Sequence, residues 1–148
     1  MTATTVRALT AADYASWKTL WDGYLVFYEA SLPDETTQTT FRRLLDGNEP
    51  MHAALAEVDG VAVGLVHFIE HRTSWSTANT MYLQDLFVSP SARRQRVGEA
   101  LIEHVYREAR ELGCAKVYWL THETNHTAMT LYNQIGEKTG FVHYRKVF

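Results

Sequence analysis

Three arginines and a glycine stand close together near the middle of the chain, in the segment RRQRVG at residues 93–98. An apolar, β-prone run over residues 81–88 precedes them. The helix expected after them carries apolar residues at helical spacing: Val97, Leu101, Val105, Ala109 and Leu112. A helix start has N–H groups without intrahelical partners and a partial positive charge, so this basic turn predicts a phosphate or diphosphate site. The alternative is an ordinary strand-to-helix connection with a solvated turn.

A second constellation of reactive side chains, HETNH at residues 122–126, matches the H-E-x-x-H pattern of zinc proteases. That chemistry requires His122 and His126 on one face inside a helix, with Glu123 as the base and a third ligand, for which His143 could be imagined. The preceding residues 117–121 are β-type, and Thr-Asn before His126 is typical of a helix cap. We therefore expect the pentapeptide to straddle a strand–helix junction without a metal. A zinc protease remains a remote alternative.

The segment at residues 93–98 resembles the acyl-CoA-binding motif of the GNAT superfamily of N-acetyltransferases, with Arg96 where the first of two glycines is usual. We expect Arg96 to keep a helical φ, because the position begins a helix. The spacing of Asn125, Ala128, Leu131 and Tyr132 is similar to the family's second motif. The resemblance implies acetyl-CoA as co-substrate, no metal, and cofactor contacts from Leu86, Phe87, Val88, Arg93, Arg94, Gln95, Arg96, Val97, Gly98, Glu99 and Asn125.

The resemblance also implies that the Tyr132 hydroxyl lies near the thioester sulfur as general acid, and a phenol is protonated at neutral pH as that role requires. The general base is open. Asp85 is either a buried structural carboxylate or a group that reaches the amine through water. On a regular strand it would face the same side as Leu83 and Phe87. Gln84 stands where polyamine-acetylating relatives often have a glutamate, and its amide cannot accept a proton.

The acceptor side is expected where the first long helix ends, because family members wall the acceptor site with their first two helices. The aromatic stripe of that helix predicts core packing, but its end is rich in aromatic and acidic residues. The residues predicted to contact substrate are Tyr24, Tyr28, Glu29, Glu70 and Gln84. The resemblance is to the branch that acetylates polyamines, histone tails or amino acids, so a small primary amine is the expected acceptor.

The elements that position these residues follow the order β-α-α-β-β-β-α-β-α-β, which is that of the GNAT fold. This is an α/β (α+β) architecture, and the family's mixed, mostly antiparallel sheet has splayed fourth and fifth strands. A capping-box-like start at Thr10 and Asp13 opens the first helix, and Asp59-Gly60 is a strong hairpin signal. The elements are expected at residues 5–9, 11–30, 34–46, 52–58, 61–71, 81–88, 97–112, 116–121, 128–135 and 141–148.

The composition fits one globular domain over residues 1–148, with 46% hydrophobic and 21% charged residues. The net charge of −3 argues against nucleic acid as partner, and no apolar run is long enough for a bilayer. Without a signal-peptide pattern, we expect a cytoplasmic protein, either monomeric or a homodimer. The lone Cys114 is expected to pack rather than act as a nucleophile. We thus expect direct acetyl transfer to an amine through a ternary complex; a non-catalytic acyl-CoA-binding module is the alternative.

Overall fold

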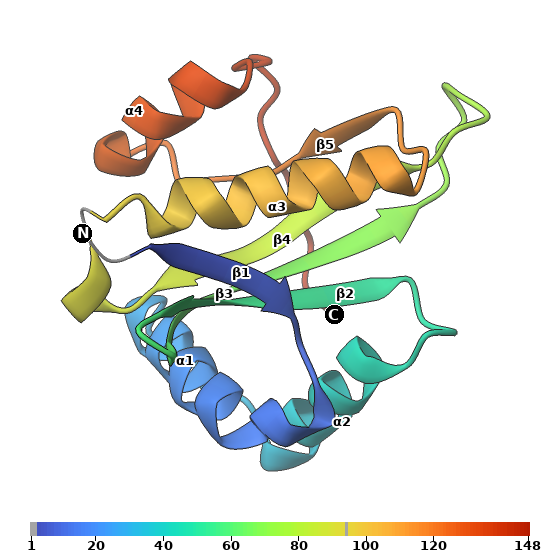
Figure 1. Ribbon diagram of the computed structural model, residues 1–148. Helices are drawn as coiled ribbons and strands as arrows, with labels where there is room; N and C mark the ends of the chain where they lie inside the picture. The colour runs from blue at the N-terminus through green and yellow to red at the C-terminus, as the bar shows by residue number, and fades with distance from the viewer. Residues whose placement is uncertain (1–2, 94) are drawn as a thin grey trace.

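The computed structural model describes residues 3–93 and 95–148 of the chain (Figure 1). Its elements are, in chain order, β1 (Thr4–Ala8), η1 (Ala11–Asp13), α1 (Tyr14–Phe27), α2 (Asp34–Leu45), β2 (Met51–Val58), β3 (Val61–His71), β4 (Thr80–Val88), η2 (Pro90–Ala92), α3 (Val97–Glu111), β5 (Lys116–Tyr118) and α4 (His126–Ile135).

The five strands form one mixed sheet in the order β1-β2-β3-β4-β5, and only the β4–β5 pair is parallel. Asp59 and Gly60 take the positive φ values of 53° and 75° between Val58 and Val61, so the predicted two-residue hairpin is confirmed. β5 pairs with β4 at only three positions, from Thr80 to Tyr82. Beyond them the two strands separate, which confirms the predicted splay.

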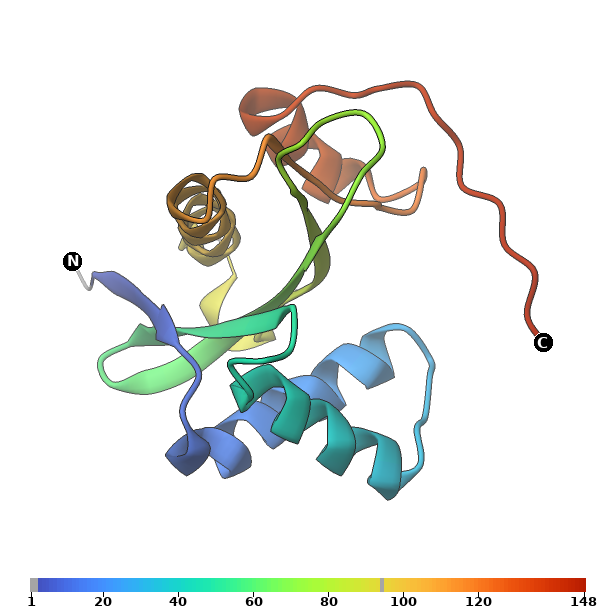
Figure 2. The same ribbon diagram turned by 90° about the vertical axis from the view of Figure 1, so that its right-hand side faces the viewer.

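Helices cover both faces of the sheet (Figures 1 and 2). α1 and α2 lie on one face, and α3 lies on the other with α4 beside the splayed strands. The first core contains Trp17, Leu20, Trp21, Phe41, Leu55, Leu65 and Phe87; the second contains Val66, Phe68, Met81, Leu101, Ile102 and Val105. Each fully buried side chain of this size contributes roughly 1.5–3 kcal/mol of transfer free energy, so both helical layers are held to the sheet by apolar burial.

The first helix is shorter than predicted at both ends. The capping box of Thr10 and Asp13 is present, but it opens the 3₁₀ turn η1 rather than an α-helical turn. At the other end the helix stops at Phe27, and Glu29 takes a left-handed φ of 52°. A left-handed residue breaks the helical hydrogen-bond ladder, so the predicted continuation to residue 30 is wrong.

The predicted final strand, residues 141–148, is absent. The segment is extended but pairs with no described strand, and its apolar side chains are exposed, Phe141 at 90% and Tyr144 at 89%. Figure 2 shows it running clear of the sheet and the helices. A strand needs a neighbouring edge for its backbone hydrogen bonds, and β5 is only three residues long. The structure therefore has five strands where the sequence predicts six.

Within the described residues, no helix combines the length and the apolar character needed to cross a lipid bilayer.

Candidate active site

A pocket of about 880 Å³ opens where β4 and β5 part. The end of α1 contributes Tyr24, Phe27 and Tyr28 to its lining, and β4 contributes Leu83, Gln84, Leu86, Phe87 and Val88. The start of α3 closes one end, while Trp119, Asn125 and Tyr132 line it from the β5–α4 side. One cavity thus joins the predicted phosphate turn to the predicted acid and to the end of α1.

The start of α3 has backbone donors that precede its first helical hydrogen bond. Its first intrahelical hydrogen bond runs from Ala100 N to Arg96 O at 3.1 Å, so the amides of Val97, Gly98 and Glu99 precede it. No side chain among the described residues caps the helix. With Arg93 and Arg96 also lining the pocket, this end of the cavity has the donors and positive charge that a diphosphate requires.

Arg96 does not have the backbone conformation that we predicted. It is the N-cap of α3 and has a left-handed φ of 60° and ψ of 26°, not a helical φ. The loop must turn sharply to enter α3, and the left-handed region makes that turn even though the residue is not glycine. The related motif usually has glycine at this position because glycine adopts a left-handed φ without steric strain. Arg96 adopts the same left-handed φ with its side chain present, so its backbone is strained.

Most of the residues predicted to contact the cofactor line this pocket. The described residues that line it include Leu86, Phe87, Val88, Arg93, Arg96, Val97, Gly98, Glu99 and Asn125. Gln95 is not among the lining residues, and Arg94 lies outside the described residues. Gly98 lies beside β4, where a Cβ would be 3.9 Å from Val88 Cγ2, an ordinary contact distance. Asn125 also caps α4, because its Oδ1 accepts from Ala128 N at 3.4 Å.

A bulge in β4 changes the face of the sheet to which the Asp85 side chain points. His67 pairs with Asp85 but its neighbour Phe68 pairs with Leu83, which leaves Gln84 as an extra residue. Leu83 consequently packs in the core beneath α3, whereas Phe87 packs beneath α1, and Asp85 contacts α1 through Tyr24. The prediction that Asp85 faces the same side as Leu83 is wrong, because the extra residue reverses the alternation along the strand.

Asp85 sits at the centre of a buried hydrogen-bonded chain. Tyr24 Oη donates to its Oδ1 at 2.7 Å, and His67 Nδ1 lies 2.9 Å from its Oδ2. On the other side of the imidazole, Trp17 Nε1 donates to His67 Nε2 at 2.9 Å. Burial, and then the adjacent Asp85 carboxylate, raise the pKa of Tyr24. Sequence reasoning missed Trp17 and His67; the available signal was a histidine in an otherwise apolar strand.

Close packing of α1 on β4 makes this contact possible. A Cβ at Gly23 would lie 2.9 Å from Phe87 Cζ, so any larger residue at this position would have to displace the Phe87 ring. The next residue, Tyr24, then reaches Asp85, and its ring lies 4.9 Å from that of Tyr28. Tyr24 therefore stands between the carboxylate and the pocket.

Tyr132 reaches the pocket from α4. Its ring packs edge-on against Trp119, with 5.5 Å between ring centroids. Burial raises the pKa of its hydroxyl, with a further contribution from Tyr28. A phenol in this setting stays protonated well above neutral pH, so it can donate a proton.

The predicted substrate contacts divide into two groups. Tyr24, Tyr28 and Gln84 line the pocket. Glu29 and Glu70 are not among its described lining residues, and the Glu70 carboxylate accepts from Asn79 Nδ2 at 2.8 Å. The assignment of these two acids to substrate binding remains a prediction, and this end of the pocket is lined by aromatic and amide side chains.

The H-E-x-x-H pentapeptide straddles a junction, as predicted. His122 and Glu123 lie in the turn before α4, and only His126 is helical, at its first residue. His122 Nδ1 contacts Thr124 Oγ1 at 2.7 Å. Within the described part of the chain, no cluster of three metal-ligating side chains is present.

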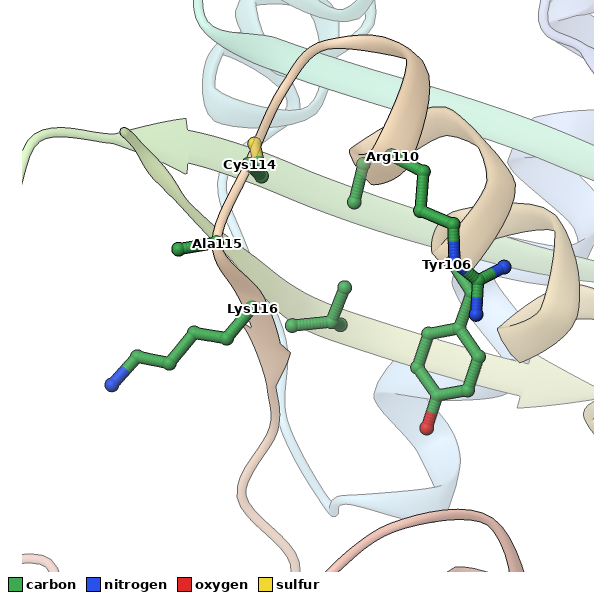
Figure 3. A pocket seen from close by; sticks show the side chains of 7 residues that line it. Tyr106, Arg110, Cys114, Ala115 and Lys116 are labelled. Atoms are coloured by element: carbon green, nitrogen blue, oxygen red, sulfur yellow. The ribbon is translucent and has the colours of Figure 1, made fainter. Parts of the chain in front are cut away.

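A smaller pocket of about 220 Å³ lies between the end of α3 and β5 and is lined by Tyr106, Arg110, Cys114 and Lys116 among others. Figure 3 shows Lys116 extending away from Arg110 and Tyr106. Burial, and then Glu70, raise the pKa of the Cys114 thiol. No described residue lines both pockets, so Cys114 is not positioned to act in the larger one.

Comparisons with known proteins agree on one family. The model of the Acetyltransferase (GNAT) family matches residues 17–136. The chain is 39% identical over 143 residues to the D-amino-acid N-acetyltransferase HPA3 of Saccharomyces cerevisiae, covering 95% of this chain and 89% of that protein. It is 29% identical over 127 residues to the thialysine N-epsilon-acetyltransferase of Bos taurus, covering 84% and 72%.

Solved structures share the fold. AAC(6')-Iy in complex with a bisubstrate analogue superposes with a TM-score of 0.83 at 21% identity, covering 99% of each chain. A probable acetyltransferase gives a TM-score of 0.85 at 24% identity and 97% coverage of each chain. Together with the family match over most of the chain, these likenesses lead to one conclusion: the protein belongs to the acetyltransferase (GNAT) family and is an acyltransferase enzyme.

Proposed function

We propose that this enzyme moves the acetyl group of acetyl-CoA directly to a primary amine of a small molecule, such as an amino acid or a polyamine. The observation that carries the proposal is the single pocket between the diverging strands. It has uncapped α3 amides with Arg93 and Arg96 at one end, Tyr132 within it and Tyr24 at the other. Those groups supply a diphosphate site, a proton donor and an acceptor wall in one continuous cavity.

Direct transfer within a ternary complex is supported by where the potential nucleophile lies. The chain has one cysteine, Cys114, and its thiol lines the smaller pocket with a raised pKa. A thiol that stays protonated is a poor nucleophile. Tyr132 is the proposed general acid for the departing thiolate, and the exposed part of β4 from Leu86 to Val88 is the proposed backbone partner of the pantetheine arm.

The acceptor class is supported by relatives and by the pocket. One relative is named for D-amino acids and others for thialysine or, in Arabidopsis thaliana, L-ornithine, all of them amines. The described acceptor end, formed by Tyr24, Tyr28 and Gln84, can accept hydrogen bonds from an ammonium group and can place aromatic faces against a cation.

The test is steady-state turnover with a panel of D- and L-amino acids, ornithine, thialysine and a diamine, followed by release of free thiol and by the mass of the acetylated amine. We expect turnover with at least one amine and intersecting double-reciprocal lines, as a ternary complex requires. Parallel lines would contradict direct transfer. Tight CoA binding without any acetylated product would instead indicate a binding module.

A further inference from the structure

We propose that the Tyr24 hydroxyl carries a proton from the acceptor ammonium to Asp85, and that His67 and Trp17 hold Asp85 in the orientation to receive it. The proposal rests on the proposed function, because it assigns the base of that amine acetylation. Tyr24 lines the large pocket, whereas Asp85 is not among its described lining residues. The 2.7 Å hydrogen bond between them therefore links the pocket to the carboxylate.

The protonation state of His67 follows from its partners. An indole N–H can only donate, so Trp17 Nε1 requires His67 Nε2 to be an acceptor without a proton. The single imidazole proton is then on Nδ1, which donates to Asp85 Oδ2 at 2.9 Å. A proton on Nε2 would place two N–H donors, those of His67 and Trp17, opposite each other without an acceptor, and His67 is only 1% exposed. His67 is therefore neutral, and its contact with Asp85 is a hydrogen bond rather than an ion pair.

Asp85 is consequently a nearly buried carboxylate held by neutral groups. Its side chain is 14% exposed, and the described side chains that bond to it are His67 and Tyr24. The other titratable groups facing this site are the hydroxyls of Tyr28 and Tyr82. Oδ1, which accepts from the pocket-lining Tyr24, is therefore the carboxylate atom placed to receive a proton from the pocket.

The transfer balances as follows. An N–H bond of the acceptor ammonium breaks and its proton bonds to Tyr24 Oη, while the original Oη–H proton moves to Asp85 Oδ1. The electron pair left on nitrogen then attacks the thioester carbonyl carbon, the C–S bond breaks, and the thiolate takes the proton of Tyr132. The second N–H proton lost from nitrogen restores Tyr132. After product release, the proton on Asp85 returns through Tyr24 to water.

The decisive variant is Tyr24→Phe, which removes the hydroxyl and keeps the ring that packs on Tyr28. At pH 7, kcat/KM for a strongly basic amine should fall by about 10²–10³-fold, with the acetyl-CoA Kd unchanged. The defect should shrink at least tenfold as pH rises through the pKa of the amine, or with a fluoroalkylamine that is already neutral at pH 7. The matched control is Tyr14→Phe, which removes a hydroxyl from the same helix outside the pocket, where it accepts from Gln38, and should leave activity unchanged.

Two further measurements complete the test. Tyr24→Phe combined with Asp85→Asn should be no slower than the slower single variant, because both lie on one proton path. In ¹⁵N NMR of the parent, the His67 signals should show the proton on Nδ1 and none on Nε2. Folded Trp17→Phe, which removes the donor to Nε2, should lower kcat with little change in KM.

A Tyr24→Phe defect of equal size at every pH and with both amines would overturn the relay, as would full activity in that variant. A proton on His67 Nε2 in the parent, or an unchanged kcat in folded Trp17→Phe, would remove His67 and Trp17 from it. Failure of the parent to acetylate any amine would overturn the proposed function instead, so the two failures are distinguishable.

Discussion

The guanidinium of Arg7 on β1 holds the carboxylate of Asp13 in η1 through two parallel hydrogen bonds, each of 2.8 Å. Thr10 donates to the same carboxylate from its backbone N at 2.7 Å and from its hydroxyl at 2.9 Å. These bonds, the one from Arg7 foremost, lower the pKa of Asp13 despite the opposing effect of burial. The start of α1 is thus fixed to the edge strand by a charged contact.

The first prediction concerns this contact and pH. Asp13→Asn should lower the free energy of unfolding by about 1–3 kcal/mol at pH 7, as for hydrogen bonds to charged groups. Because the folded pKa is depressed, the stabilisation is complete above the unfolded pKa of about 3.9 and is lost as pH falls through the folded value. Urea denaturation at pH 7 and pH 3 measures the difference. Asp22→Asn is the control, since its ion pair with Lys18 is exposed to solvent and should contribute little to the free energy of unfolding.

A second prediction tests the strain at Arg96. A left-handed residue other than glycine costs about 1–2 kcal/mol, part of which glycine returns through its greater freedom in the unfolded chain. Arg96→Gly should therefore stabilise the free protein by about 0.5–1 kcal/mol. Arg93→Gly should destabilise it, because Arg93 has an ordinary φ of −65°. The urea midpoints of both variants measure these changes in stability. A destabilised Arg96→Gly would mean that the Arg96 side chain stabilises the fold by more than its strained backbone destabilises it.

The third prediction concerns the start of α3. CoA at a hundred times its Kd should stabilise the fold by about 2.7 kcal/mol, which raises Tm by about 5–10 °C in a domain of this size. Gly98→Val should abolish most of the shift, because a branched side chain would occupy the space between the helix start and the phosphates. Dephospho-CoA should still raise Tm in the parent.

Gly98→Ala separates ligand effects from folding effects. Its Cβ would meet only Val88 Cγ2 at ordinary contact distance, so the free variant should be at least as stable as the parent. A CoA shift that survives intact in Gly98→Val would show that the diphosphate binds elsewhere.

The fourth prediction concerns Tyr132. Tyr132→Phe should lower kcat by about 10²–10⁴-fold with little change in acetyl-CoA affinity, because a positioned acid acts on the leaving thiolate rather than on binding. Burial raises the pKa of Tyr132, so its ionisation should not cause any loss of kcat below about pH 10. The pH profile of kcat in the parent, beside that of the variant, measures both. Unchanged kcat in the variant would exclude Tyr132 from the chemistry.

Features that depend on neighbouring residues in the sequence were predictable. The capping box of Thr10 and Asp13, the hairpin at Asp59-Gly60 and the start of α3 at Val97 all rest on local backbone chemistry, and the structure has each of them. The gathering of Asn125 and Tyr132 on the pocket was also expected, because their spacing resembles the second motif of the GNAT family, whose Asn and Tyr lie near the cofactor.

Features that depend on register or on distant packing were not predictable. The bulge at Gln84 reverses the direction of Asp85, and no local pattern marks where an antiparallel pair takes an extra residue. The contacts of His67 with Trp17 and Asp85 join residues 50 and 18 positions apart. Residues 141–148 have strong β propensity but pair with no described strand, so propensity alone predicted an element that packing does not provide.

β4 pairs with β5 only from Thr80 to Tyr82. β4 is therefore an interior strand of the sheet at its start and an edge strand toward its end. Amides of β4 that point toward β5 beyond Tyr82 lack a described strand partner, although the opposite side is bonded to β3. In the free protein, deuterium should replace those amide protons within seconds to minutes, while protons shared with β3 persist far longer. Acetyl-CoA should slow the exchange between Leu83 and Val88 selectively if its pantetheine arm completes the sheet in place of a strand. Uniform slowing across the whole domain would indicate global stabilisation alone.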